Sequence, residues 1–136
     1  MQKQIIYAFA LSFFFLSGFT RLQAQNRNVE VTFTFVGIEE GYDHQNKSEL
    51  YIDGQLVGTS DVKNESQPNT VSGMTTKGEH TIRIVNYAYY EGEWEAHTMD
   101  NNYSIDCVLE KTVKIKKKKT SFHAVFDIDD SPHWEK

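Results

Sequence analysis

The sequence predicts an all-β protein, a single small β-sandwich of immunoglobulin-like or jelly-roll type with about seven or eight short antiparallel strands. Apolar and polar residues alternate almost throughout the chain, a period of two that is typical of half-buried strands. Turn residues separate these short runs. No stretch of ten or more residues shows the 3.6-residue apolar period of an amphipathic helix.

The first half of the chain predicts one long strand and one hairpin. The long strand has its apolar positions at Val29, Val31, Phe33 and Phe35. A polar loop over residues 37–47 separates it from the hairpin, whose signal is Asp53-Gly54 between two short apolar runs. This pair favours a type I′ turn, because both central positions need positive φ. Residues 60–69 form a second polar loop.

The second half predicts further strands over residues 79–87, 103–109, 113–115 and 122–128. Residues 88–102 are rich in aromatic and acidic side chains, and their pattern defines no clear element. The sandwich domain is therefore expected to cover residues 25–128. Residues 129–136 form a polar tail with one proline, which we expect to fray.

The N-terminus is typical of a signal peptide over residues 1–24. Lys3 precedes an apolar stretch from Ile5 to Leu16, which is too short for a membrane-spanning helix of about 20 residues. Leu22-Gln23-Ala24 places a small residue before the cut, which we expect between Ala24 and Gln25. The mature protein would then be secreted or periplasmic and would not span a membrane.

The mature chain would be acidic. Removing 24 of the 136 residues leaves 112, and losing Lys3 and Arg21 from 14 basic residues leaves 12 against 19 acidic ones, a net charge of −7. We therefore expect no nucleic-acid partner, since that binding depends on neutralising phosphates. Cys107 is the single cysteine and forms no internal disulfide, so we expect it to be a small buried apolar residue.

Two segments resemble the PEGA-type domain, a small β-sandwich of exported and cell-surface bacterial proteins. Residues 50–59, LYIDGQLVGT, are similar to its strand-turn-strand with a DG-x-x-VGT core, and residues 78–84, GEHTIRI, to its G-x-H-x-I strand start. The chain departs from the family where Ser60 and Asp61 stand in place of a proline, and it lacks the upstream Pro-Gly-Ala motif. The resemblance implies an extracytoplasmic binding or scaffolding module without an active site.

An aromatic cluster is the first candidate binding site. It consists of Tyr87, Tyr89, Tyr90 and Trp94. Aromatic faces pack against sugar rings and dominate protein interfaces, although the same rings could instead fill the core of the sandwich. Alternation along a strand places Tyr87 and Tyr89 on one face and Tyr90 on the other.

A row of carboxylates and one imidazole is the second candidate site. Glu91, Glu93, Glu95 and His97 occur at every second position and would share one face of an extended strand. Carboxylate oxygens suit Ca²⁺ and an imidazole nitrogen suits Zn²⁺. The row would otherwise be a solvated surface. Neighbours two apart along a strand are about 7 Å apart, so one ion would reach only about two of these side chains.

The motifs of common enzymes are missing, including G-x-S-x-G, H-E-x-x-H and C-x-x-C. The sequence therefore favours a non-catalytic binding or scaffold module that contacts a glycan or an envelope protein and carries no cofactor. The first alternative is a metal-dependent module or small hydrolase that uses the Glu91 to His97 row. A second is a structural subunit that pairs through a strand edge. The sequence does not define the oligomeric state.

Overall fold

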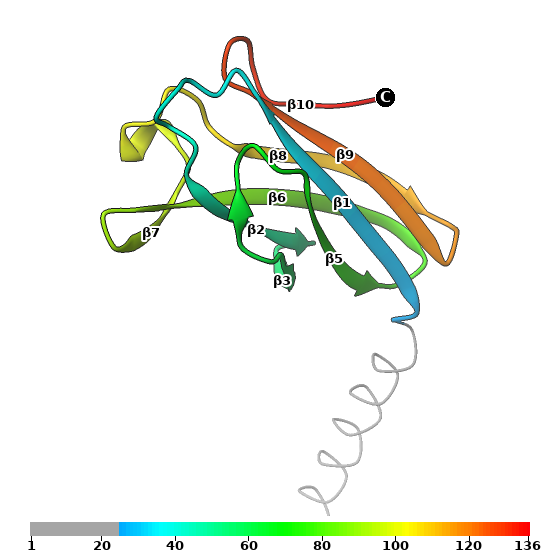
Figure 1. The fold of residues 1–136 in the computed structure, drawn as a ribbon. Coiled ribbons are helices and arrows are strands. Elements are labelled where there is room, and N and C mark those ends of the chain that lie inside the picture. Colours follow the sequence, from blue (N-terminus) through cyan, green and yellow to red (C-terminus); the bar gives the residue numbers. More distant parts are fainter. Residues whose placement is uncertain (1–24) are drawn as a thin grey trace, which may run out of the picture.

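A computed structural model describes residues 25–136 and shows two β-sheets that face each other as a sandwich (Figure 1). The smaller sheet has four strands in the order β10-β9-β1-β5. The larger has six, with β3-β2-β6-β7 along its path, β4 beside β2 and β8 beside β6. This confirms the predicted all-β sandwich. The expected signal peptide, residues 1–24, lies outside the described residues.

The strand bounds are β1 (Arg27–Val36), β2 (Gln45–Ile52), β3 (Gln55–Thr59), β4 (Lys63–Asn64), β5 (Asn69–Thr75), β6 (Gly78–Tyr90), β7 (Glu93–Ala96), β8 (Val108–Ile115), β9 (Lys119–Asp127) and β10 (His133–Trp134). One 3-10 turn, Met99–Asn101, lies between β7 and β8. Within residues 25–136, no helix has the length and apolar character needed to cross a membrane.

The core lies between the two sheets and is built from the alternating positions of the long strands. β1 and β9 contribute from one sheet and β2 and β6 from the other, and their fully buried members include Val31, Phe33, Leu50, Ile82, Ile84 and Phe126. Cys107 is also fully buried in this cluster, as expected from its pattern. Burial of this apolar surface supplies the main driving force for folding.

The pairing of β1 with β9 is parallel, with Val31 opposite Phe122, whereas the sequence predicted antiparallel strands throughout. That expectation is wrong for this pair. β1 is the first strand and β9 follows the whole larger sheet, so the intervening chain is the long crossover that a parallel pair requires. β1 pairs with β5 in the expected antiparallel manner.

The predicted hairpin turn is present between β2 and β3. Asp53 and Gly54 both have positive φ, at 51° and 81°, as a type I′ turn requires. The Asp53 carboxylate also accepts a hydrogen bond from the Thr81 N–H (2.9 Å) and contacts His80 Nδ1 (2.6 Å). The turn is thereby tied to the start of β6.

Two predictions for the second half of the chain differ from the structure. Residues 103–107 form a loop, and the strand expected over 103–109 begins only at Val108 as β8. The tail expected to fray contains β10, in which Trp134 pairs with Ala124 and packs against Phe122 with ring centroids 6.2 Å apart. The apolar ring of Trp134 anchors the tail because it covers this side of β9.

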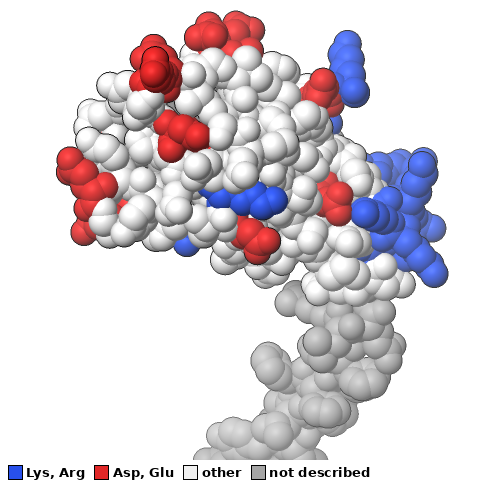
Figure 2. Space-filling view, in the orientation of Figure 1, with Lys and Arg blue, Asp and Glu red and all other residues white. Residues whose placement is uncertain are grey.

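Charge is distributed unevenly over the surface. On the face in Figure 2, acidic side chains lie along the end where Figure 1 places β7, and the largest group of Lys and Arg lies at the opposite end. The turn between β8 and β9 supplies exposed lysines at 116–118. Lys119 forms an ion pair with Glu30 (3.3 Å). The lysines at 116–118 thus lie in a solvent-exposed turn.

Candidate functional site

β6 changes its partner at Asn86, and this junction positions the loop of residues 97–107. β8 pairs with the first part of β6 and β7 with the last part. Between them, the Asn86 N–H donates to the carbonyl of Cys107 (3.0 Å), and the Asn86 carbonyl accepts from the His97 N–H (2.9 Å). The Cys107 N–H donates to the carbonyl of His97 (2.8 Å), which closes the loop. His97 is therefore fixed at the base of the loop.

The side chain of Asn86 holds this junction to β2. It is fully buried, and its amide nitrogen donates to Asn46 Oδ1 (2.9 Å) and Ser48 Oγ (3.0 Å). These donated hydrogen bonds favour a single arrangement of the strands here, whereas Asn86 Oδ1 has no partner within residues 25–136.

Glu65 reaches the same region from the other side. It follows β4, which pairs with the start of β2, and its N–H donates to the carbonyl of His44 (2.9 Å). Its side chain is only 2 % exposed, and Oε1 lies 3.4 Å from His97 Nδ1 and 3.8 Å from His44 Nδ1. Among residues 25–136, neither Glu65 Oε1 nor His97 Nδ1 has a hydrogen-bond partner. The pair is therefore buried and incompletely satisfied.

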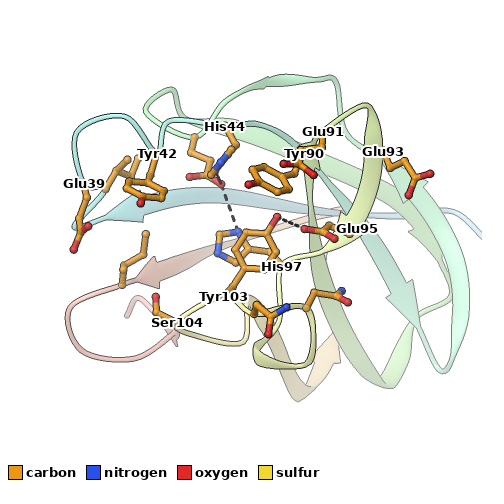
Figure 3. Close-up of a pocket in the computed structure, with 15 residues that line it drawn as sticks. Glu39, Tyr42, His44, Tyr90, Glu91, Glu93, Glu95, His97, Tyr103 and Ser104 are labelled. Atoms are coloured by element: carbon orange, nitrogen blue, oxygen red, sulfur yellow. Dashed lines mark hydrogen bonds and ion pairs between the residues drawn. The ribbon is translucent and has the colours of Figure 1, made fainter.

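An open cleft of about 850 Å³ contains these side chains (Figure 3). This volume is within the range of roughly 300–1,000 Å³ found for small-ligand sites. Tyr103 packs on His97 with ring centroids 4.1 Å apart, and Tyr90 meets His44 edge to face at 5.8 Å. Tyr42 lies on the other side of His44 in Figure 3, with ring centroids 6.3 Å apart. Three tyrosines thus form aromatic walls over a polar floor.

The electrostatic character of the cleft is negative. Four further carboxylates lie around it, from Glu39, Glu91, Glu93 and Glu95, and no Lys or Arg is present among the described residues that line it. Tyr103 Oη donates to Glu95 Oε1 (2.7 Å). Burial, followed by this hydrogen bond, raises the pKa of Tyr103 above its usual value, and the charge of Glu91 raises the pKa of Tyr90.

The structure divides the predicted aromatic cluster. Tyr90 lines the cleft, whereas Tyr89 and Trp94 pair on the outer face of the larger sheet with ring centroids 5.2 Å apart. The Lys47 ammonium lies 4.5 Å from the Trp94 ring centroid. Tyr87 is half-buried on that outer face. The predicted separation of Tyr90 from Tyr87 and Tyr89 is confirmed.

The predicted metal row is brought to the cleft but not as one strand face. Glu91, Glu93, Glu95 and His97 all line the cleft. Glu91 lies in the turn between β6 and β7 with φ at 49°, which breaks the expected row, and Glu93 points away from the rings in Figure 3. Among residues 25–136, no three His, Cys, Asp or Glu side chains are arranged to hold a metal ion.

Three residues of the cleft were not singled out from the sequence. Glu65 lies within the polar loop predicted over 60–69, and nothing in that loop distinguishes it from its exposed neighbours. His44 also lies in a predicted polar loop, and Tyr103 in a predicted strand. Only the pairing of β4 with β2 and the closure of the 97–107 loop bring the three together.

The fold and the cleft define a small β-sandwich with an acidic, aromatic cleft among the loops at one end. No protein-family model matches the chain. A search of curated proteins finds no match either. The chemistry of the cleft is therefore the basis for assigning a function.

Proposed function

We propose that this protein is an exported, non-catalytic binding module that captures a basic segment of an envelope protein in the acidic cleft. The observation that carries the proposal is the lining of the cleft, which combines five glutamates and three tyrosines without a Lys or Arg among the described residues. A site with this excess of acceptors and negative charge favours a partner that brings donors and positive charge.

The tyrosine walls support the same partner class. The faces of aromatic rings carry negative electrostatic potential, so ammonium and guanidinium groups bind to them as well as to carboxylates. Tyr42 and Tyr90 are both exposed, at 61 % and 49 %, and would gain contact area on binding. The acidic end of the molecule in Figure 2 would also steer a basic partner toward the cleft.

Export rests on the sequence of residues 1–24, and the resemblance to PEGA-type domains agrees with a role outside the cytoplasm. The loops that build the cleft connect strands of a packed sandwich, a common arrangement in which a rigid scaffold presents binding loops. We therefore assign the cleft to recognition and the two sheets to its support.

Fluorescence anisotropy with labelled peptides tests this function. The probes are three nonapeptides that alternate glycine with arginine, glutamine or glutamate, titrated at 0.15 M salt with protein produced from the full 136-residue chain. We expect saturable binding of the arginine peptide and at least tenfold weaker binding of the other two.

Two neighbouring tyrosines provide a matched pair of variants. Tyr90→Ala removes one aromatic wall of the cleft and should lower the affinity for the arginine peptide at least tenfold. Tyr89→Ala makes the same change on the outer face and should leave its affinity within about twofold, because exposed residues outside a site contribute little. Equal binding of the arginine and glutamine peptides, or equal effects of the two variants, would refute the cleft as the capture site.

A glycan platform is a second candidate function, favoured by the exposed Tyr89–Trp94 pair on the outer sheet face. The two ring planes are inclined by 55°, so a sugar ring would pack against the exposed face of one of them. Titration with N-acetylglucosamine oligomers should change the tryptophan fluorescence of the wild type but not of Trp94→Phe. An unchanged wild-type spectrum would exclude this platform for that sugar.

A further inference from the structure

We propose that Glu65 forms a buried subsite for one organic cation, the guanidinium or ammonium group of a basic side chain inserted into the cleft. This inference rests on the proposed function and specifies its deepest contact. It assigns specificity to a residue that the sequence places in an ordinary polar loop.

The first support is the unsatisfied state of Glu65. Its side chain is 2 % exposed, it lines the cleft, and its Oε1 accepts no hydrogen bond from residues 25–136. A buried carboxylate oxygen without a donor is energetically costly, and native proteins rarely retain one. A ligand cation that reached this atom would supply the missing donor and the missing charge.

The second support is the lack of a fixed cation beside this carboxylate. Within the described residues, the basic groups that approach Glu65 are His44 at 3.8 Å and His97 at 3.4 Å. Arg and Lys are permanently charged donors, but none of the residues lining the cleft is of either type. Because the neighbours of Glu65 are imidazoles and neither Lys nor Arg, a bound ligand can supply a full positive charge to this carboxylate.

The third support is the path from solvent to Glu65. Glu91 is exposed, Glu95 is half-buried and Glu65 is buried, and all three line the cleft, so negative charge extends from its surface to its interior. Tyr90 and Tyr103 flank this path with their rings. A long aliphatic stem with a terminal cation matches this sequence of surfaces, since its stem packs on rings while its head meets carboxylates.

The chemistry favours an organic cation over a metal ion. No three His, Cys, Asp or Glu side chains among residues 25–136 are arranged to coordinate an ion. A guanidinium or ammonium group needs no such coordination shell, because it binds through hydrogen bonds to separate oxygens and through ring faces.

NMR titration with four small probes tests the subsite. The cationic probes are the Nα-acetyl methylamides of arginine and lysine, and the neutral ones are the corresponding citrulline and norleucine derivatives. We expect saturable shifts of the Glu65, His97 and Tyr103 backbone resonances with at least one cationic probe. Its neutral counterpart should bind at least tenfold more weakly. The arginine and lysine arms distinguish a guanidinium from an ammonium.

Two glutamate variants test the contribution of Glu65 to cation binding. Glu65→Gln should lower the affinity for the cationic probe at least tenfold. Glu79→Gln makes the same chemical change on an exposed residue of β6 that does not line the cleft and should leave the affinity within threefold. If Glu65→Gln does not fold, the comparison of arginine with citrulline on the wild type decides, because equal affinities would overturn the subsite.

The outcomes also separate the subsite from the proposed function. Tyr90-sensitive binding of the arginine nonapeptide with no effect of Glu65→Gln would overturn the subsite and leave the capture function intact. A cleft that binds neither the nonapeptide nor the small probes would overturn both. A parallel titration with Zn²⁺ provides a third outcome. If one equivalent of Zn²⁺ saturates the shifts of the His44 and His97 resonances while the arginine probe has no effect, the ligand of the site is a metal ion and the organic-cation subsite is overturned.

Discussion

His97 Nδ1 lies 3.4 Å from Glu65 Oε1 at the base of the cleft, and within residues 25–136 neither atom has a hydrogen-bond partner. Buried polar groups are nearly always paired, so this contact is a local departure from what stability alone would select. Departures of this kind are concentrated at functional sites, where the fold gives up some stability for binding.

The first prediction is that Glu65→Gln stabilises the ligand-free protein by about 1–3 kcal/mol, the typical cost of an unsatisfied buried polar group. Glutamine keeps the shape, carries no charge and can donate to His97 Nδ1. Urea unfolding at pH 7.5 measures the free energy. Glu93→Gln is the control and should change it by less than about 0.5 kcal/mol, as surface substitutions usually do. A large loss of stability in Glu65→Gln would instead show that the negative charge of Glu65 already stabilises the folded protein.

Tyr103 should make the protein sensitive to alkali. Burial and then the hydrogen bond to Glu95 raise the pKa of Tyr103 above the 10.0 of an ordinary tyrosine. The folded state therefore holds this proton more tightly than the unfolded state. The resulting stability is complete below about pH 10 and is lost as the pH rises toward the folded-state pKa.

Replacing this tyrosine tests that linkage. Tyr103→Phe should lose about 1 kcal/mol at pH 8, because it removes the hydrogen bond to Glu95, and should show a shallower decline above pH 10. Urea midpoints measured from pH 8 to pH 11 provide the comparison with the wild type. Parallel declines in both proteins would show that Tyr103 carries no such linkage. Tyr51, whose pKa is raised chiefly by its hydrogen bond to Glu49, would contribute equally to both curves.

Asp53 should link the β2–β3 turn to acid stability. The hydrogen bond with His80, followed by that from the Thr81 N–H, lowers the pKa of Asp53 below 3.8. Its contribution is therefore present above pH 3.8 and is lost as the pH falls through the lower folded-state pKa.

The Asp53→Asn variant should melt at a lower temperature than the wild type at pH 6, and the difference should shrink below pH 4. Asp100→Asn, an exposed carboxylate, serves as the control and should track the wild type. Thermal melts followed by circular dichroism at each pH give the comparison. A difference between Asp53→Asn and the wild type that stays constant from pH 6 to pH 3 would contradict the link to the Asp53 charge.

The strands with local signals could be predicted from the sequence, and their partners could not. β1 alternates strictly, and Asp53-Gly54 carries its own turn chemistry, so both are confirmed. β9, the parallel partner of β1, follows in the sequence only after all strands of the larger sheet, and no local pattern encodes that pairing. Trp134 shows the same limit, because its packing on Phe122 depends on tertiary contact.

The candidate site could be predicted in part. Tyr90 and the Glu91, Glu93, Glu95 and His97 series all line the cleft, because they are near in sequence and share the end of β6 and β7. Glu65 could not be found this way, since it is buried only after β4 pairs with β2. A residue of a polar loop can thus be buried while its neighbours, here Asn64 and Ser66, stay exposed.

Cys107 should be unreactive in the folded protein. Its side chain is fully buried, and burial followed by the charge of Glu65 raises the pKa of its thiol well above the ordinary value. The thiolate is the reactive form, so a thiol reagent should modify it only when the structure opens. Native protein with DTNB should release almost no thiolate in one hour, and one equivalent in 6 M guanidinium. Rapid reaction of the native protein would show that the 97–107 loop opens readily.

Gly58 should be the glycine least tolerant of substitution. A Cβ atom there would lie 1.9 Å from the backbone carbonyl oxygen of Ser72, where strand β3 of the larger sheet approaches β5 of the smaller one. Neither backbone can move without disturbing its own sheet. Gly58→Ala should therefore cost at least about 3 kcal/mol, a value at the upper end for overpacking.

Gly54→Ala provides the comparison for Gly58, because its φ is 81° and nothing lies within 4 Å of the added Cβ. It should cost only the strain of a left-handed residue, about 1–2 kcal/mol. Urea unfolding of both variants measures the difference. If Gly58→Ala were no worse than Gly54→Ala, β3 could separate from β5 at little cost. The closeness of the two sheets at this edge would then contribute little to the stability of the sandwich.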